Sequence, residues 1–243
     1  MRACLFTVEH DESYYLPIFL KWYGETFAPE DIYILAHNAS DKHKEELLRA
    51  EKDGFNVEHL TTEEIFNHDW LNSVVHGRQR QLLEQYDYVM FVDCDELVTP
   101  TEGTLREFID NATEEAYRCD GFEIHEDIHK YIGNKFMYRS VGFCKTPLTR
   151  IPLTYVHGYH RSEPEFQVND KLRLYHIHKL NWAESWARNQ RISQEKWDKF
   201  ALDNGLGTHN SISGEQDYRD FWIRDVPGED DRYPVPKEVL DRL

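Results

Sequence analysis

The sequence has little that would direct the chain into a membrane or a disulfide-linked fold. No apolar stretch approaches the ~20 residues of a membrane span. The N-terminus, MRACLFTVEHDE, lacks the apolar core and cleavage site of a signal peptide. The 4 cysteines stand far apart without a CxxC pair, so neither a disulfide framework nor a zinc cage is indicated. We therefore expect a cytoplasmic protein with free thiols.

Positive charge is also scarce. The 28 Lys and Arg residues face 45 Asp and Glu residues, which gives a formal net charge of −17. Nucleic acids and anionic membranes bind basic surfaces, so we expect no nucleic-acid partner. The lack of a long apolar stretch predicts no membrane span. An acidic protein that binds an anionic ligand must gather positive charge locally, through a metal ion or a few Arg and Lys side chains. Length and composition predict one domain over residues 1–224 and a loosely packed tail over 225–243.

Strand and helix patterns alternate through the first hundred residues. Strands are expected at 3–8, 31–36, 56–60 and 88–92, with amphipathic helices between them. This alternation predicts right-handed βαβ units and an α/β fold with a mostly parallel central sheet. Short strand patterns at 121–124, 136–143 and 148–151 predict antiparallel additions in the C-terminal half. A further strand is expected at 172–178 and a long amphipathic helix at 182–203.

An acidic motif follows the most apolar of these strands. Residues 88–92 (YVMFV) lead directly into Asp93, Asp95 and Glu96. Open α/β sheets bind their ligands at the carboxyl ends of such strands. Burying three carboxylates is costly unless a cation neutralises them, and a divalent ion with oxygen ligands is the simplest candidate. The alternative is an acidic turn without a ligand.

Polar residues also follow the first and second strands. Glu9 and His10 end the first, and Asn38 and Asp41 follow the second. These residues converge with the acidic motif on one edge of a parallel sheet, where nucleotides bind. Asn38 or Asp41 could hydrogen-bond a base or ribose, or both could cap the following helix.

Two arginines precede the acidic strand. Arg78 and Arg80 lie on the expected helix before it. The guanidinium group offers a bidentate fork to phosphate, so either residue could reach a diphosphate. The alternative is a solvated helix face with ion pairs one turn apart.

Four histidines fall in two short segments. His157 and His160 stand in VHGYH, and His176 and His178 stand in LYHIHK. On a strand, His176 and His178 point to the same face. Either could complete an oxygen-rich metal site, and imidazole suits Mn²⁺ better than Mg²⁺. His176 is favoured because it directly follows the apolar part of the strand.

Taken together, these motifs resemble the nucleotide-sugar glycosyltransferases of the GT-A fold, in particular the family-2-like group. The resemblance extends over about residues 3–190. It is carried by an opening strand with an acidic loop, a second strand ending in NASD, the DxD motif DCDE, and the downstream GYH and LYH segments.

The resemblance implies a metal-dependent site that binds a nucleoside-diphosphate sugar. Asp95, with Asp93, would hold Mn²⁺ or Mg²⁺ on the diphosphate, and His176 would be a further metal or phosphate contact. Glu9, Asn38 and Asp41 would line the nucleoside pocket. The first loop reads Val-Glu-His where the family has an Asn before its acids, so the base is left open.

The resemblance also implies transfer of the sugar to a hydroxyl group of a glycan or another acceptor. In inverting members a carboxylate on the acceptor side takes the proton from that hydroxyl. No motif identifies this base in the sequence. Glu126, Asp127 and Glu163 are candidates from position only.

Two other functions compete with this interpretation. A haloacid-dehalogenase-type phosphatase would use Asp93 as nucleophile and Asp95 as acid/base, but that motif normally opens its fold, and here it follows three strands. A non-catalytic module would bind the nucleotide sugar without turnover.

Overall fold

The computed structural model describes residues 1–243 except 64–66, 129–133, 157, 206 and 208–211. A ten-stranded mixed sheet runs through the molecule in the order β12-β7-β6-β8-β4-β1-β2-β3, and β11 joins it to β5. Its strands are β1 (Ala3–Glu9), β2 (Ile32–His37), β3 (Asn56–Leu60), β4 (Tyr88–Phe91), β5 (Glu96–Pro100), β6 (Ala116–Glu126), β7 (Lys135–Arg139), β8 (Leu148–Thr149), β11 (Val168–His176) and β12 (Tyr233–Pro234). A separate ribbon pairs β9 (Thr154–Tyr155) with β10 (Ser162–Glu163).

The N-terminal half of the sheet is parallel. Strands β3, β2, β1 and β4 pair in that order, all in the same direction. Alternate residues of β1 face opposite sides: Leu5 packs in one apolar cluster with α1 (Tyr15–Tyr23) and α2 (Asp41–Lys52), and Phe6 packs in another with α3 (His68–Leu83). Both faces are therefore covered, which explains why β1 and β4 are apolar without alternation. The predicted α/β class is confirmed.

The C-terminal half adds mainly antiparallel strands, as predicted. Strand β6 pairs antiparallel with β7 and β8, and β7 pairs antiparallel with β12. Strand β11 lies between β5 and β6, antiparallel to the first and parallel to the second. Its register places His176 opposite both Glu96 and Glu123. Two segments far from each other in sequence are thus brought beside the acidic motif.

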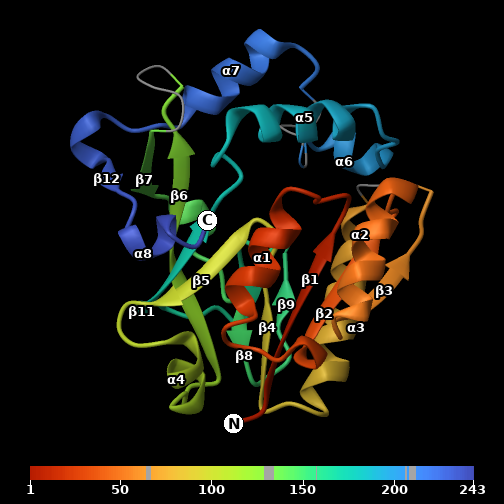
Figure 1. Ribbon diagram of the computed structural model, residues 1–243, viewed down its shortest axis with the longest axis vertical. Helices are drawn as coiled ribbons and strands as arrows, with labels where there is room; N and C mark the ends of the chain where they lie inside the picture. Colours follow the sequence, from red (N-terminus) through yellow and green to blue (C-terminus); the bar gives the residue numbers. More distant parts are fainter. Residues whose placement is uncertain (64–66, 129–133, 157, 206, 208–211) are drawn as a thin grey trace.

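Several helices lie over the carboxyl edge of the parallel strands, where the ligand site was expected. They are α5 (Trp182–Ser193), α6 (Lys199–Asp203) and α7 (Glu215–Arg224). The expectation of one continuous helix over 182–203 was wrong, because α5 ends at Ser193 and α6 starts only after Asp198, whose carboxylate caps it. Figure 1 shows α5 and α6 above the tips of β1 and β2, with α7 beyond α5 on the side of β6. They form a roof over this edge.

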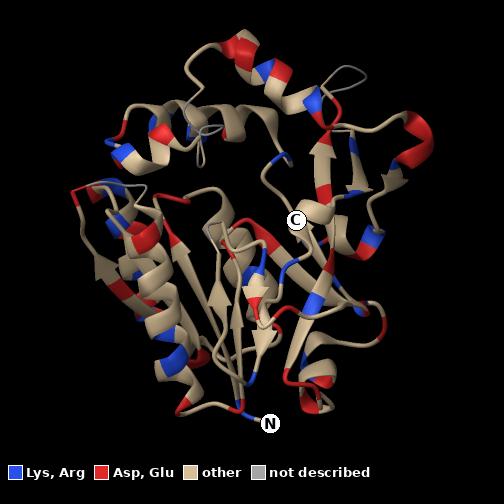
Figure 2. Ribbon diagram, turned by 180° about the vertical axis from the view of Figure 1, so that it is seen from behind, with Lys and Arg blue, Asp and Glu red and all other residues tan. Residues whose placement is uncertain are grey.

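The other helices pack on the sides of the sheet. Helix α4 (Leu105–Asp110) follows β5, and short 3₁₀ turns occur at η1 (Pro29–Asp31), η2 (Val141–Phe143) and η4 (Glu229–Asp231). The segment expected to be a loose tail contains β12 and α8 (Lys237–Leu240), with Val235 and Val239 buried in the main core. In the view of Figure 2, Lys and Arg are scattered among Asp and Glu along the ribbon. Within the described part of the chain, no helix is long and apolar enough to cross a membrane.

Candidate functional site

A cavity of about 1050 Å³ opens at the carboxyl ends of β1, β2 and β4. One end is bounded by the first loop, α3 and the acidic motif, and the other by β7, α7 and the C-terminal segment. Among the described residues, its ionisable lining consists of Glu9, His10, Glu12, His37, His68, Asp93, Asp95, Glu96, Glu123, Arg139, Lys145, His160, His176, His178, Lys179, Arg188, Asp225 and Asp231, with the cysteine and tyrosines Cys94, Tyr138, Tyr159 and Tyr233.

The acidic motif forms the turn between β4 and β5. The Asp93 side chain is 31% exposed, whereas Glu96 is almost fully buried. The ammonium group of Lys145 lies 2.6 Å from Asp93 Oδ2 and 2.6 Å from Glu96 Oε1. Burial raises the pKa of Glu96 to about 7, while the neighbouring Lys145 acts to lower it. Lys145 was not predicted, because a single Lys in the loop region before residue 148 carries no motif.

Asp95 faces two histidines instead. Its Oδ2 lies 3.6 Å from His176 Nε2 and 3.6 Å from His178 Nδ1. Burial acts to raise the pKa of Asp95, but the two imidazoles and Arg188 hold it well below its usual range. Asp95 is therefore an ionised carboxylate at neutral pH. His176 is the last residue of β11 and His178 lies just after it, and both face Asp95, as their predicted shared face implies.

His176 lies between two carboxylates. Its Nδ1 is 2.9 Å from Glu123 Oε1, and its ring stacks on Phe143 with centroids 4.0 Å apart. Burial acts to lower the pKa of His176, but Glu123 and Asp95 raise it to about 10. The ring is thus an imidazolium in this arrangement. Glu123 was missed because β6 alternates little and gives no acidic motif.

The three predicted metal ligands do not converge on one point in this arrangement. Asp93 pairs with Lys145, while Asp95 and His176 pair with each other. Within the described ranges, no group of three or more His, Cys, Asp or Glu side chains is placed so that it could hold a metal ion. Metal binding at Asp93, Asp95 and His176 stays a prediction.

Glu9 and His10 both line the cavity, at the end of β1. Glu9 Oε2 accepts a hydrogen bond of 3.0 Å from the Glu12 N–H and lies 2.8 Å from His43 Nε2. His10 Nδ1 lies 2.8 Å from the backbone oxygen of His37. The first loop is thus held by α2 and β2, and presents His10 to the cavity.

Asn38 and Asp41 lie outside the cavity lining. Asn38 Oδ1 accepts a bond of 2.9 Å from the Thr62 N–H, which ties the end of β2 to the segment after β3. Asp41 is an exposed residue in the first turn of α2 and forms an ion pair with Lys44. The cap of α2 is Ser40. The structure thus gives both residues local roles at the start of a helix or loop.

The two predicted phosphate-binding arginines also lie elsewhere. Arg78 on α3 forms an ion pair with Glu58 on β3. Arg80 is an exposed residue on the same helix. Neither contributes to the described lining: Arg80 lies on an exposed helix face, whereas the Arg78 side chain is 16% exposed and packs toward β3.

The three candidate bases do not line the cavity in the described part of the chain. Glu126 is buried, and its Oε2 accepts a bond of 2.7 Å from the Trp182 N–H at the start of α5. Asp127 is buried 3.8 Å from Arg232. Glu163 is an exposed residue of β10. Of the second histidine pair, His160 lines the cavity, and His157 lies outside the described residues.

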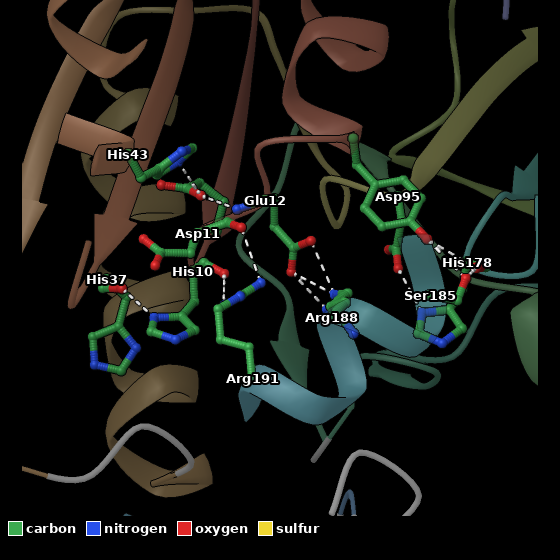
Figure 3. A network of polar contacts seen from close by, with 12 residues as sticks. His10, Asp11, Glu12, His37, His43, Asp95, His178, Ser185, Arg188 and Arg191 are labelled. Atoms are coloured by element: carbon green, nitrogen blue, oxygen red, sulfur yellow. Dashed lines mark hydrogen bonds and ion pairs between the residues drawn. The ribbon is translucent and has the colours of Figure 1, made fainter. Parts of the chain in front are cut away.

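A second ion pair, which the sequence did not reveal, joins the first loop to the roof. The Nε of Arg188 on α5 donates to both carboxylate oxygens of Glu12, at 2.8 and 2.9 Å. Arg191, one turn further on, donates to the backbone oxygens of His10 and Asp11. Figure 3 shows both arginines reaching from α5 to this loop, beside Asp95 and His178. Charged residues with i,i+3 spacing on an amphipathic helix are the only sequence signal for this contact.

A scan against protein-family models gave no match, and a search of curated proteins gave none either. Solved structures that show partial similarity include the following three. A cytidylyltransferase from Leptospira borgpetersenii serovar Hardjo-bovis matches 51% of this chain and 54% of its own, at 13% identity and a TM-score of 0.32. HddC from Yersinia pseudotuberculosis matches 77% of this chain and 97% of its own, at 9% identity and 0.44. S. aureus TarS 1-349 matches 100% of this chain and 77% of its own, at 10% identity and 0.41.

With TM-scores below 0.5, these similarities are partial and say nothing about the activity of this chain. The match to the cytidylyltransferase spans about half of that protein.

Proposed function

We propose that this protein is a glycosyltransferase that uses a nucleoside-diphosphate sugar. One observation carries the proposal: the DxD turn, the first loop and the end of β11 all open into one cavity at the carboxyl edge of the sheet. Ligands of open α/β sheets bind at this edge. A volume of about 1050 Å³ also leaves room for a donor and part of an acceptor.

The charge of the cavity supports a cation in the complex. Eight Asp and Glu residues but only four Lys and Arg residues line its described part. A diphosphate would meet net repulsion there unless a cation came with it. This supports Mn²⁺ or Mg²⁺ as the cofactor, with Asp95, Asp93 and His176 as the proposed ligands. When bound, such an ion neutralises charge that develops on the departing nucleoside diphosphate.

Binding of that ion requires local changes. Asp93 must share its carboxylate between Lys145 and the new cation, and His176 must lose its proton to offer Nε2. Asp95 would likewise share its carboxylate between the two imidazoles and the ion. We assign Asp95 the principal role in holding the ion, because its carboxylate is buried in the cavity wall and, among the described residues, forms no ion pair with a lysine.

The two ends of the cavity suggest where donor and acceptor bind. Glu9 and His10, at the end of β1, lie at the nucleoside end. At the other end the lining includes Asp225, Asp231 and Tyr233. The acceptor hydroxyl would approach from that end, and inverting transfer would need a carboxylate there as base.

Isothermal titration with a panel of UDP-, GDP- and dTDP-sugars, with and without Mn²⁺, tests the proposal. We expect binding of one donor class that depends on the ion. A lack of binding to every donor under both conditions would contradict the proposal and would direct attention to phosphatase substrates. Donor binding without transfer or hydrolysis would instead indicate a binding module.

A further inference from the structure

Lys145 closes a ring of contacts around Asp93. Its ammonium group lies 2.6 Å from Asp93 Oδ2 and 2.6 Å from Glu96 Oε1. The other oxygen of Glu96 accepts a hydrogen bond of 3.0 Å from the Asp93 N–H. The side chain and the backbone of Asp93 are thus both fixed, one by Lys145 and the other by Glu96.

Lys145 is itself held in place by its backbone. Its carbonyl oxygen accepts a bond of 2.7 Å from the Cys119 N–H on β6, and its own N–H donates to Phe143 at 2.9 Å. Strand β6 approaches this segment very closely at Gly121, where an added Cβ would lie 2.3 Å from the Phe143 carbonyl carbon. The Lys145 side chain is 7% exposed. Its ammonium group therefore has a well-defined position.

This segment serves both sides of the acidic turn. Phe143 stacks on His176, which faces Asp95, while Lys145 holds Asp93. The short segment 143–145 thus contacts Asp93 directly and Asp95 through His176. An ammonium group has three donors and no acceptor, so it can bind two carboxylates that would otherwise repel each other.

We propose that Lys145 is a positioning residue for donor binding: it holds the Asp93 carboxylate at the cavity wall and fixes the geometry of the DxD turn. This inference rests on the proposed function. The competing explanation is that Lys145 only compensates the charge of buried Glu96. The two explanations predict different donor affinities for a variant that lacks both the Glu96 charge and the lysine.

The test compares Lys145→Met, Glu96→Gln and the double variant by thermal unfolding and by titration with the donor found for the wild-type protein, in the presence of Mn²⁺. Lys145→Met should unfold at a lower temperature, because Glu96 remains buried without its partner. The double variant should regain most of that loss. Its donor affinity should nevertheless be at least about tenfold weaker than wild type, since Asp93 is no longer held. Glu96→Gln alone should weaken donor binding less than the double variant does, because Lys145 still pairs with Asp93.

Lys44→Met is the matched control, because Lys44 is an exposed lysine that pairs with an exposed aspartate. It should change neither property. Wild-type affinity in the stable double variant would overturn the inference while leaving the proposed function intact. If the wild-type protein binds no donor, both fall.

Lys145→Arg gives a second result should the double variant not fold. It keeps the charge opposite Glu96, but its planar fork is wider than an ammonium group and would displace Asp93. Preserved stability with about tenfold weaker donor binding supports the positioning role. Unchanged affinity would contradict it.

Discussion

Arg188 and Glu12 are 176 positions apart, and the Arg188 Nε donates to both carboxylate oxygens of Glu12. Glu12 lies in the loop after β1, whereas Arg188 lies on α5, in the helical roof of the cavity. Both side chains are largely buried: that of Glu12 is 6% exposed and that of Arg188 is 18% exposed. This pair joins the first loop to the roof beside the end of β1 and makes the roof part of the cavity wall.

Arg188→Met should therefore destabilise the protein strongly. The change leaves the buried Glu12 carboxylate without its partner, and breaking a buried pair costs about 3–5 kcal/mol. Urea unfolding measures this loss. Arg224→Met removes an exposed pair with Asp225 and should cost less than about 0.5 kcal/mol. Equal effects of the two changes would show that the Glu12 contact contributes little.

Two glycines should respond in opposite directions to alanine. A Cβ at Gly121 would lie 2.3 Å from the Phe143 carbonyl carbon and 2.7 Å from the Cys144 nitrogen, so backbone must shift. We expect Gly121→Ala to destabilise by about 1–3 kcal/mol or more. Gly77 lies within α3 with nothing within 4 Å of an added Cβ. Gly77→Ala should stabilise by about 0.5–1 kcal/mol, because alanine favours the helix. Chemical denaturation of both variants measures the change in unfolding free energy and thus checks its sign.

The His43–Glu9 pair should give a stability that depends on pH. Although burial acts to lower the pKa of His43, its bonds with Glu9 and Glu46 raise the net value above the ordinary one. The stabilisation is thus complete below the unfolded value of about 6.5 and is lost as pH rises through the folded value. The difference in unfolding free energy between wild type and His43→Gln should shrink accordingly above pH 6.5. A difference that grows with pH would contradict the pairing.

Glu163→Gln should leave the proposed transfer within about twofold of wild type, because Glu163 is an exposed residue outside the described cavity lining. Asp225→Asn, which changes a carboxylate of the cavity lining at the proposed acceptor end, is the variant to compare with Glu163→Gln. The measurement is the turnover rate of both variants with the donor identified by titration. A large loss of turnover in Glu163→Gln with unchanged donor affinity would return Glu163 to the site.

Much of the fold was predictable from local patterns. The apolar runs of β1 and β4 signal strands buried on both faces, and their order with the helices predicts the parallel sheet. The sequence also placed the acidic turn, the first loop and His176 at strand ends, and all three line the cavity. Position at a strand end is a local signal, and parallel topology brings such ends together.

Contacts between distant segments were not predictable in the same way. Glu123 reaches the cavity through the pairing of β11 with β6, and Arg188 through the packing of α5. Lys145 is placed there by backbone hydrogen bonds to Cys119 and Phe143, and no spacing rule encodes any of these contacts.

Asn38 and Asp41 show the converse ambiguity. Their residue types suit both ligand binding and local turns, and in the structure the local hydrogen bonds and ion pair occupy them.

The most direct test of the central claim is the Mn²⁺-dependent affinity of the donor for wild type, Asp95→Asn and Asp41→Asn. Asp95 is the buried, ionised carboxylate beside His176, whereas Asp41 is an exposed aspartate on α2. We predict that Asp95→Asn abolishes the Mn²⁺-dependent part of binding and that Asp41→Asn binds like wild type. Unchanged Mn²⁺-dependent binding in Asp95→Asn would contradict the assignment of this site.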